Sequence, residues 1–147
     1  MKVVIQRVCS ASVLSEGVEA GKIEKGLLLY IGVSAEDTME DVTYIAEKIP
    51  VLRIFPDEND KMNRSLLDAD GAILAVSQFT LIGDCSHGRR PGFSDAMPPE
   101  PAKELYEALV SLWREKGIPV ETGVFQTDMR VASVNWGPVT FILESKK

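Results

Sequence analysis

Apolar residues in the first quarter of the chain gather in short runs that are typical of β-strands. Lys2–Val8 and Gly26–Val33 are rich in valine, leucine and isoleucine, and Ser12–Glu24 has the pattern of a hairpin that turns near Glu16-Gly17. The three segments are short and lie close together. They predict a β-rich beginning of the chain.

From Asp37 onward the apolar residues recur with the spacing of an α-helix. Asp37 or Thr38 is suited to cap this helix, and Pro50 closes the segment. The apolar positions are Met39, Val42, Ile45, Ala46 and Ile49. A second helix is predicted over Pro101–Lys116, with Gly117 at the position where helices commonly end.

The remaining apolar runs predict further strands and one long loop. The predicted strands are Val51–Phe55, Ala72–Leu81, Val120–Phe125, Arg130–Val134 and Val139–Glu144. Gly83–Pro99 holds too many glycines and prolines for a regular element. The whole pattern predicts an α/β fold over residues 1–147. We expect a single layered domain of about eight mostly antiparallel or mixed strands in a barrel-like pair of sheets, with two helices packed on one face.

Composition narrows the class of protein. A chain of 147 residues that is 45% hydrophobic and 26% charged is typical of a globular domain. Its apolar runs fall short of the roughly 20 residues that a membrane helix needs, and we expect no membrane partner. Cys9 and Cys85 lack the spacing of metal ligands. We therefore expect free thiols, a cytoplasmic protein, no metal and no cofactor.

The formal charge of −6 is unevenly distributed. Residues 14–60 hold 11 acidic and 4 basic side chains, whereas the rest of the chain holds 11 acidic and 12 basic ones. Because nucleic-acid binding relies on Lys and Arg, the average charge argues against indiscriminate binding of this kind. The acidic excess is confined to one stretch, so the charge of the other segments does not exclude binding of an RNA.

The common catalytic motifs are absent, and five local features remain as candidates for chemistry, three of which are charged or ionisable side chains. His87, in the Gly83–Pro99 loop, is either a solvated histidine or a catalytic base. Arg89 and Arg90 are either a grip for phosphate or solvated surface arginines. Arg7 lies in a predicted strand and would need a partner if buried, such as the carbonyls of a loop that it could hold in place.

Two further segments place polar or special residues beside strands. Ser77-Gln78-Phe79-Thr80 ends a predicted strand, where alternation puts Ser77 and Phe79 on one face and Gln78 and Thr80 on the other. These residues either cap an edge strand or form a site. Gly137-Pro138 either makes an ordinary turn between two strands or presents bare carbonyls to a ligand.

Taken together, these segments resemble the D-aminoacyl-tRNA deacylases over essentially the whole chain. The segments that carry the resemblance are Val4–Val8 with Ala11–Val13, Lys61–Ser65, Ser77–Leu81, Gly88–Pro91, Val120–Gly123, Asp128-Met129 and Asn135–Thr140. The Ser-Gln-Phe-Thr-Leu and Gly-Pro-Val-Thr motifs are the most specific of them. The resemblance implies an enzyme that hydrolyses the ester between a D-amino acid and the terminal ribose of tRNA, and that also accepts glycyl-tRNA.

The resemblance also implies a homodimer with active sites at the subunit interface. In that family the Gly-Pro peptide is cis and enters the partner's pocket, where its carbonyls exclude L-side chains; this role falls on Gly137 and Pro138. Arg7 matches an arginine that holds the Gly-Pro loop. The other implied site residues are Ser77, Gln78, Phe79 and Thr80 on the pocket wall, and Phe125 and Met129 near the terminal adenosine.

Two accounts of the chemistry follow from the resemblance. In one, Thr80 is the nucleophile; in the other, the 2′-hydroxyl of the tRNA assists hydrolysis. The residues favour the second account because nothing near Thr80 in the motif supplies a base. This chain departs from the family at Trp136, where Asp is usual, and at Gln126-Thr127, where Gly-Ala is usual. A non-catalytic RNA-binding dimer and a small-molecule esterase are the competing hypotheses.

Overall fold

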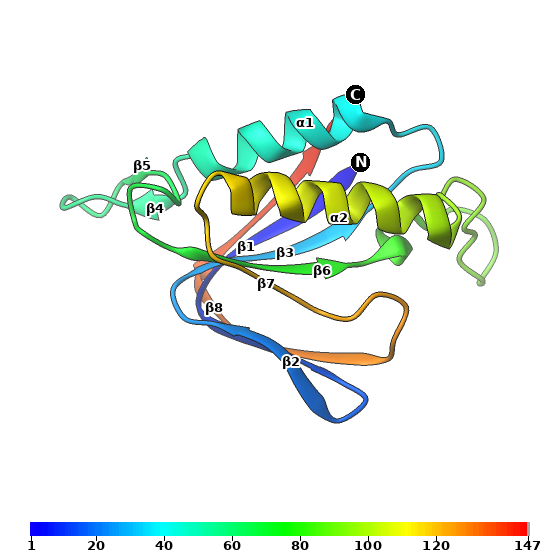
Figure 1. The fold of residues 1–147 in the computed structure, drawn as a ribbon, viewed down its shortest axis with the longest axis horizontal. Coiled ribbons are helices and arrows are strands. Elements are labelled where there is room, and N and C mark those ends of the chain that lie inside the picture. Colours follow the sequence, from blue (N-terminus) through cyan, green and yellow to red (C-terminus); the bar gives the residue numbers. More distant parts are fainter. Residues whose placement is uncertain (147) are drawn as a thin grey trace.

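The computed structural model describes residues 1–146, which form eight strands and two α-helices (Figure 1). The strands are β1 (Lys2–Ser15), β2 (Val18–Ile23), β3 (Gly26–Gly32), β4 (Phe55–Pro56), β5 (Met62–Arg64), β6 (Ala72–Ser77), β7 (Val120–Thr122) and β8 (Met129–Glu144). The helices are α1 (Met39–Lys48) and α2 (Pro99–Glu115). The predicted α/β class with about eight strands and two helices is confirmed.

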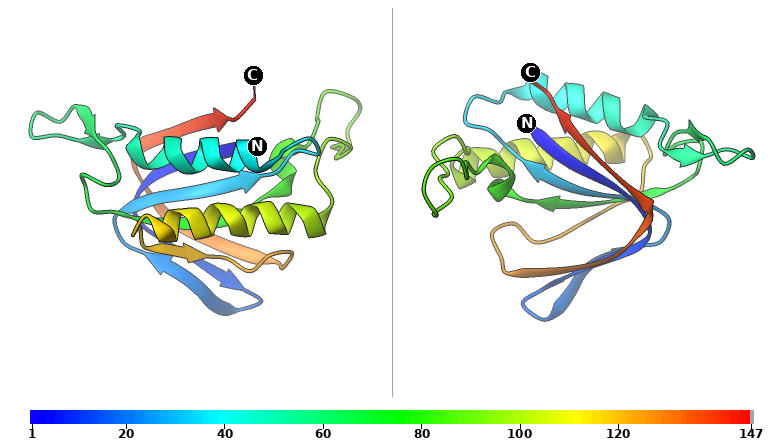
Figure 2. Two further views of the ribbon diagram at one scale, coloured as in Figure 1. Left: turned by 45° about the horizontal axis from the view of Figure 1, so that its top comes forward. Right: turned by 180° about the vertical axis from the view of Figure 1, so that it is seen from behind.

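The main sheet combines antiparallel and parallel pairs. Its strands follow the order β2-β1-β3-β6-β7, and β8 also pairs with β1. β3 and β6 are parallel, as are β6 and β7. Parallel neighbours need a crossover connection, which α1 and α2 provide, so both helices lie on the same face of the sheet (Figures 1 and 2). This layering places the loops after β3 and β6 at one edge.

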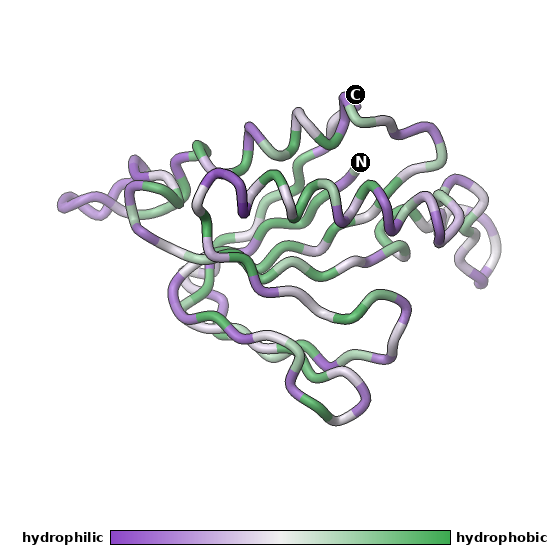
Figure 3. Tube along the Cα trace, in the orientation of Figure 1, coloured by the Kyte–Doolittle hydropathy of each residue, from purple (hydrophilic) through white to green (hydrophobic). Residues whose placement is uncertain are grey.

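The sheet is strongly bent, which creates two apolar cores. Figure 2 shows β1 and β8 curving together. The second half of β1, the first half of β8 and β2 lie below the part of the sheet that carries the helices. Leu27, Leu29 and Ile31 of β3 belong to the core beneath the helices, whereas Leu28 belongs to the core inside the bend. Successive side chains of a strand point to opposite faces. β3 is therefore almost entirely apolar because it faces a core on each side, as the hydropathy in Figure 3 reflects.

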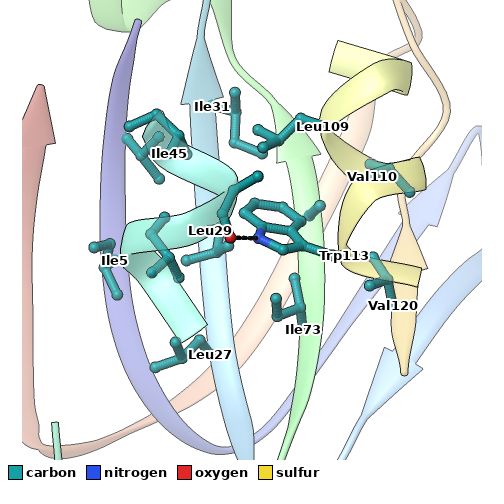
Figure 4. Packing of buried hydrophobic residues seen from close by; sticks show 14 of the residues in the cluster. Ile5, Leu27, Leu29, Ile31, Ile45, Ile73, Leu109, Val110, Trp113 and Val120 are labelled. Carbon is teal, nitrogen blue, oxygen red and sulfur yellow. Dashed lines mark hydrogen bonds between the residues drawn. The ribbon is translucent and has the colours of Figure 1, made fainter. Parts of the chain in front are cut away.

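Trp113 is the largest side chain in the core beneath the helices. It is fully buried, and its indole N–H donates to the carbonyl of Ala46 in α1 at 3.2 Å (Figure 4). Leu29, Ile73 and Leu109 lie in the same cluster. The bond links the two helices and satisfies the polar atom of an otherwise apolar ring.

The two helices begin and end close to their predicted bounds. Thr38 caps α1, since its hydroxyl accepts from the Glu40 N–H while Asp41 accepts from the Thr38 N–H. Four of the five predicted apolar positions are buried, but Met39 is exposed because it lies in the first turn. Within residues 1–146, no helix is long and apolar enough to cross a membrane.

Three predicted strands have different bounds in the structure. The strand predicted over Val120–Phe125 ends at Thr122, and two others differ more. Val51–Phe55 is not a strand: a 3-10 helix spans Ile49–Val51, and only Phe55–Pro56 pairs, with β5. Pro50 cannot donate to a ladder, which disfavours a strand there. The segment predicted as Ala72–Leu81 leaves the sheet after Ser77, and Phe79–Ile82 forms a second 3-10 helix.

The strands predicted over Arg130–Val134 and Val139–Glu144 are one continuous strand, β8. It pairs with β1, which is itself continuous through Ser15. Asn135–Val139 is therefore not the turn of a hairpin. Pairing with a single long partner keeps both halves of β8 in one ladder, and the irregular segment is accommodated as a bulge.

Candidate active site

A cleft of about 690 Å³ opens where β6 leaves the sheet. Three connections line it: the turn after β6, the loop that leads into α2, and the loop between β7 and β8. The lining residues are Val33, Val76, Ser77, Gln78, Phe79, Phe93, Ala96, Met97, Pro98, Pro99, Ala102, Phe125, Gln126, Thr127, Asp128, Met129 and Val131. Functional groups are commonly placed at such strand ends, where loops rest on a rigid sheet.

The turn after β6 has its own hydrogen bonds. The Gln78 N–H donates to the Ile31 carbonyl at 2.7 Å, which fixes the turn to the end of β3. The Leu81 N–H donates to the Gln78 carbonyl at 3.2 Å, and the Gly83 N–H to that of Thr80 at 3.0 Å. Phe79 is the first residue of this 3-10 helix, where a main-chain N–H has no partner within the helix.

The predicted alternation across Ser77–Thr80 is wrong because the strand ends at Ser77, and Phe79 and Thr80 are in a 3-10 helix. Ser77, Gln78 and Phe79 all line the cleft, whereas Thr80 does not. Thr80 is exposed, and its hydroxyl accepts a hydrogen bond from the Gln78 amide. An amide N–H is a donor and cannot take a proton from the threonine.

Aromatic packing shapes the entrance to the cleft. The rings of Phe79 and Phe93 meet edge to face with centroids 5.2 Å apart, and both side chains remain well exposed. This geometry is favourable for aromatic pairs. Two exposed rings beside a cleft provide an apolar surface suited to stacking against a flat ligand group.

The loop between β7 and β8 forms the opposite wall. Phe125, in this loop, and Met129, the first residue of β8, both line the cleft and are half-buried. Thr127 holds the loop, since its hydroxyl donates to the Val124 carbonyl at 2.9 Å and lies 2.7 Å from the Ser15 hydroxyl. The structure thus brings Phe125 and Met129 together with Ser77, Gln78 and Phe79.

The cleft contains almost no acid–base chemistry. Asp128 is the single ionisable side chain among the lining residues, and no histidine, lysine, cysteine or tyrosine is present there. Among residues 1–146, no three His, Cys, Asp or Glu side chains are grouped so as to hold a metal ion. Main-chain N–H groups and side-chain amides and hydroxyls are the polar groups that the cleft offers.

Gly137, Pro138 and Arg7 do not line this cleft. They lie where β1 and β8 bend, in a bulge whose extent follows from the register. Gln6 pairs with Thr140 and Val8 with Asn135, so the four residues 136–139 stand opposite Arg7 alone. The Gly137-Pro138 peptide bond is cis, and both residues are exposed.

The Asn135 side chain closes the base of the 136–139 bulge. Its amide donates to the carbonyls of Arg7 and Val139, each at 3.2 Å. One residue thereby joins the two ends of the bulge to β1. Local sequence offered no signal for this role, which depends on the pairing of β1 with β8.

The Arg7 side chain is buried and holds the bulge by hydrogen bonds. It is 7% exposed, and its Nε donates to the Trp136 carbonyl at 3.2 Å. Its Nη1 donates to the Ile54 carbonyl at 2.8 Å, just before β4. A buried guanidinium needs such partners, as the sequence indicated. Ile54 could not have been identified in advance, because it is 47 residues away.

Gly137 has backbone angles and surroundings that exclude a side chain. Its φ is +126°, a value that favours glycine. A Cβ at this position would lie 2.8 Å from Val139 Cγ2 and 3.1 Å from Arg7 Nη2. Glycine therefore lets the bulge approach the guanidinium closely.

The remaining candidates lie in solvent. His87 Nδ1 is 2.9 Å from the Ser86 hydroxyl and 3.5 Å from Asp84, and its side chain is 90% exposed. This matches the interpretation of a solvated loop histidine. Arg89 and Arg90 are exposed on the same loop, whose base is an isolated bridge between Asp84 and Gly92.

The whole chain is similar to known deacylases. A profile of the family described as D-Tyr-tRNA(Tyr) deacylase matches residues 4–144. Proteins described as D-aminoacyl-tRNA deacylase from Pelobacter propionicus and Thermosipho africanus are each 56% identical to it. The alignments cover 98% and 100% of this chain and 99% of each relative.

Solved structures share the fold. One, described as "c-Myc DNA Unwinding Element Binding Protein", superposes with a TM-score of 0.94 at 39% identity and covers 100% of both chains. Another, described as a probable eukaryotic D-amino acid tRNA deacylase, has a TM-score of 0.82 at 18% identity and covers 97% of this chain and 98% of its own. The second likeness concerns the fold alone.

Fold and full-length similarity together define a hydrolase of the kind that acts on carboxylic ester bonds. The chain belongs to the D-Tyr-tRNA(Tyr) deacylase family. The predicted family and the predicted enzyme class are thereby confirmed.

Proposed function

We propose that this protein hydrolyses the ester bond of D-aminoacyl-tRNA and releases the free D-amino acid and tRNA. The observation that carries the proposal is membership of the deacylase family over residues 4–144, combined with Ser77, Gln78 and Phe79 lining one cleft. The whole chain would act as one deacylase domain in the cytoplasm, where aminoacyl-tRNA is used.

The proposed catalytic segment is Ser77–Thr80, of which Ser77, Gln78 and Phe79 line the cleft. The main-chain N–H of Phe79 would donate to the oxygen of the ester carbonyl as negative charge develops on it. Phe125 and Met129, on the opposite wall, would contact the terminal adenosine. No metal and no cofactor takes part in this proposal.

Thr80 does not serve as the nucleophile in this proposal. A threonine hydroxyl needs a neighbouring base, and its one bonded side chain, Gln78, donates to it. The 2′-hydroxyl of the tRNA would instead assist the attack of water on the ester carbonyl. A tRNA that ends in 2′-deoxyadenosine tests this route: hydrolysis should fall steeply, and full activity would contradict it.

A complete site requires a homodimer. Gly137 and Pro138 are exposed and do not line the cleft of their own protomer, so they would act in the partner's cleft. Strand β8 also exposes large apolar side chains, at Val134, Phe141 and Ile142. Exposed apolar residues of this size favour burial against another chain.

The Gly137-Pro138 segment would provide the chiral selection. Its carbonyls would occupy the side of the substrate on which an L-side chain projects, so that the L-enantiomer clashes while a D-side chain fits. Glycine has no side chain to exclude. Glycyl-tRNA is therefore an expected second substrate.

The acidic stretch 14–60 would face away from the tRNA. Val33 is its single contribution to the lining of the cleft, and Val33 is apolar. No Lys or Arg lines the cleft, so few phosphates would be neutralised there and binding should depend only weakly on salt concentration. A steep dependence would contradict this arrangement.

Incubation with D-tyrosyl-tRNA and, separately, with L-tyrosyl-tRNA tests the proposal. We expect selective release of D-tyrosine. Binding of both tRNAs without release would instead support an RNA-binding dimer. The departures at Trp136 and Gln126-Thr127 argue for this alternative, and so does the solved relative at 39% identity whose name states binding to a DNA element. Cleavage of free D-amino acid esters with indifference to tRNA would support a small-molecule esterase.

A further inference from the structure

Trp136 contacts Arg7 twice. Its carbonyl accepts from Arg7 Nε at 3.2 Å, and its ring lies over the same guanidinium, with Arg7 Cζ 4.4 Å from the ring centroid. The main chain and the side chain of one residue thus approach the charged group from different directions.

The charge of Arg7 has no acidic partner. None of the ion pairs within residues 1–146 includes it, although the side chain is only 7% exposed. Two carbonyls, of Trp136 and Ile54, and the face of the indole take the place of a carboxylate. A cation over an aromatic face is stabilised most when water is excluded.

The indole also packs against a second aromatic ring. Phe55 of β4 lies 6.2 Å from it between centroids, with the planes tilted by 57°. The ring belongs to the apolar core beneath the helices as a partly buried member. Trp136 therefore packs within its own protomer, and its orientation is set by the body of the protein.

The position of Arg7 in turn sets that of Gly137. Arg7 Nη2 lies 3.1 Å from where a Cβ of Gly137 would be, so the guanidinium forms the floor beneath this residue. A shift of the guanidinium would let the Gly137-Pro138 segment move with it. Small displacements of groups that contact substrate have large effects on reaction rates.

We propose that Trp136 is a positioning residue for chiral selection, which acts by holding the Arg7 guanidinium under Gly137. This inference rests on the proposed function of Gly137 and Pro138. The π face of the indole is the essential feature, and its apolar bulk alone does not suffice.

The test compares two substitutions at Trp136 with one at the other tryptophan of the chain. Trp136→Phe keeps an aromatic face, whereas Trp136→Leu keeps apolar bulk without one. Trp113→Phe is the matched control, because Trp113 is fully buried between the helices and bonds to Ala46, away from the bulge. For each protein, kcat/KM is measured on D-tyrosyl-tRNA and L-tyrosyl-tRNA, together with Tm.

We expect Trp136→Leu to lower the D-to-L ratio of kcat/KM about tenfold, which equals about 1.4 kcal/mol. Trp136→Phe should recover most of the ratio. Trp113→Phe should lower Tm and leave the ratio unchanged, since it destabilises the core without touching Arg7. A normal ratio in Trp136→Leu, or an equal loss in Trp113→Phe, would overturn the inference. If Trp136→Leu does not fold, Trp136→Met replaces it.

A second measurement does not depend on activity. The Arg7 Nε–H signal in the NMR spectrum should carry a ring-current shift in the wild type and in Trp136→Phe, and lose it in Trp136→Leu. An unchanged signal in Trp136→Leu would show that the ring does not hold the guanidinium. If instead the wild type fails to release D-tyrosine, the proposed function fails while this contact remains measurable.

Discussion

The cleft after β6 and the bulge at residues 136–139 of β8 are built in opposite ways. The cleft is assembled from loops at the ends of parallel strands, and its polar side chains are exposed or half-buried. The bulge interrupts an antiparallel ladder and rests on the buried Arg7 side chain. One region offers an open surface for a substrate, and the other offers a fixed piece of main chain.

In the proposed function, this difference separates reaction from selection. The reaction would depend on main-chain donors and on the substrate's own hydroxyl, so single side chains of the cleft would contribute little. Exclusion of an enantiomer depends on rigid placement, so the residues that hold the bulge contribute much. The two regions lie apart in one protomer, which is the reason for the proposed dimer.

Gly137→Ala should have the largest effect. The added Cβ meets Val139 Cγ2 at 2.8 Å and Arg7 Nη2 at 3.1 Å, so the bulge or these two side chains must shift. We expect D-to-L selectivity to fall by about 100-fold. Gly17→Ala is the matched control: Gly17 also has a positive φ, of +83°, but nothing lies within 4 Å of its Cβ position. Equal losses in both variants would contradict a role specific to the bulge.

Arg7→Met should weaken both stability and selection. Methionine keeps the apolar stem but leaves the Trp136 and Ile54 carbonyls without their donor. Buried acceptors without a hydrogen-bond donor are destabilising, and we expect a loss of about 2 kcal/mol in the free energy of unfolding. Urea denaturation measures it, and the assay with both tyrosyl-tRNAs should show reduced discrimination. An unchanged discrimination would remove Arg7 from the selection.

Asp41→Asn should alter stability without altering selection. Burial raises the pKa of Asp41, but hydrogen bonds from Ser145, Thr38 and Lys146 outweigh this and lower it from 3.8 to about 2. The folded form therefore favours the carboxylate above pH 4, and this stabilisation is lost as the pH falls toward 2. We expect Asn to cost about 1 to 2 kcal/mol at neutral pH and almost nothing near pH 2.

Asp41 lines neither the cleft nor the bulge, so its variant separates stability from specificity. Denaturation curves across this pH range test the first point. The D-to-L ratio at neutral pH should equal that of the wild type. A changed ratio would show that selection follows global stability instead of the placement of the bulge.

Thr80→Ala should have the smallest effect. Thr80 does not line the cleft, and its hydroxyl accepts a hydrogen bond from the Gln78 side-chain amide. We expect kcat/KM on D-tyrosyl-tRNA to fall by less than about tenfold, or about 1.4 kcal/mol. A loss of several orders of magnitude in a folded variant would restore Thr80 as the nucleophile.

Much of the fold could be predicted because its signals are local. Thr38 with Asp41 at the start of α1, Gly117 after α2 and the apolar run of β3 each report on a few neighbouring residues. Where the predicted bounds of a strand were wrong, contacts with residues distant in the sequence set the observed bounds. The Gln78 N–H still bonds to Ile31 of the neighbouring strand β3, and the chain then leaves the sheet in the 3-10 helix Phe79–Ile82. The pairing with β3 ends at Ser77, and a local pattern does not contain this register.

The candidate site divides in the same way. The residues of the cleft and bulge were recognised as motifs, since Ser77–Thr80 and Gly137-Pro138 are contiguous in the chain. Arg7 was also recognised as a support of the Gly-Pro segment, but two other supports were not. Phe93 at the cleft and Asn135 at the bulge carry no distinctive local pattern, and their roles depend on the partners that the fold gives them.

The sequence by itself determined the local elements of this protein. Apolar spacing, helix caps and short motifs depend on the chemistry of adjacent residues. The tertiary structure alone decided that β1 and β8 run as one bent ladder and that Arg7 faces residues 136–139. The register of β1 with β8 and the contact of Arg7 with residues 136–139 join residues more than a hundred positions apart. Such relations exist only once the strands have paired, so no single segment encodes them.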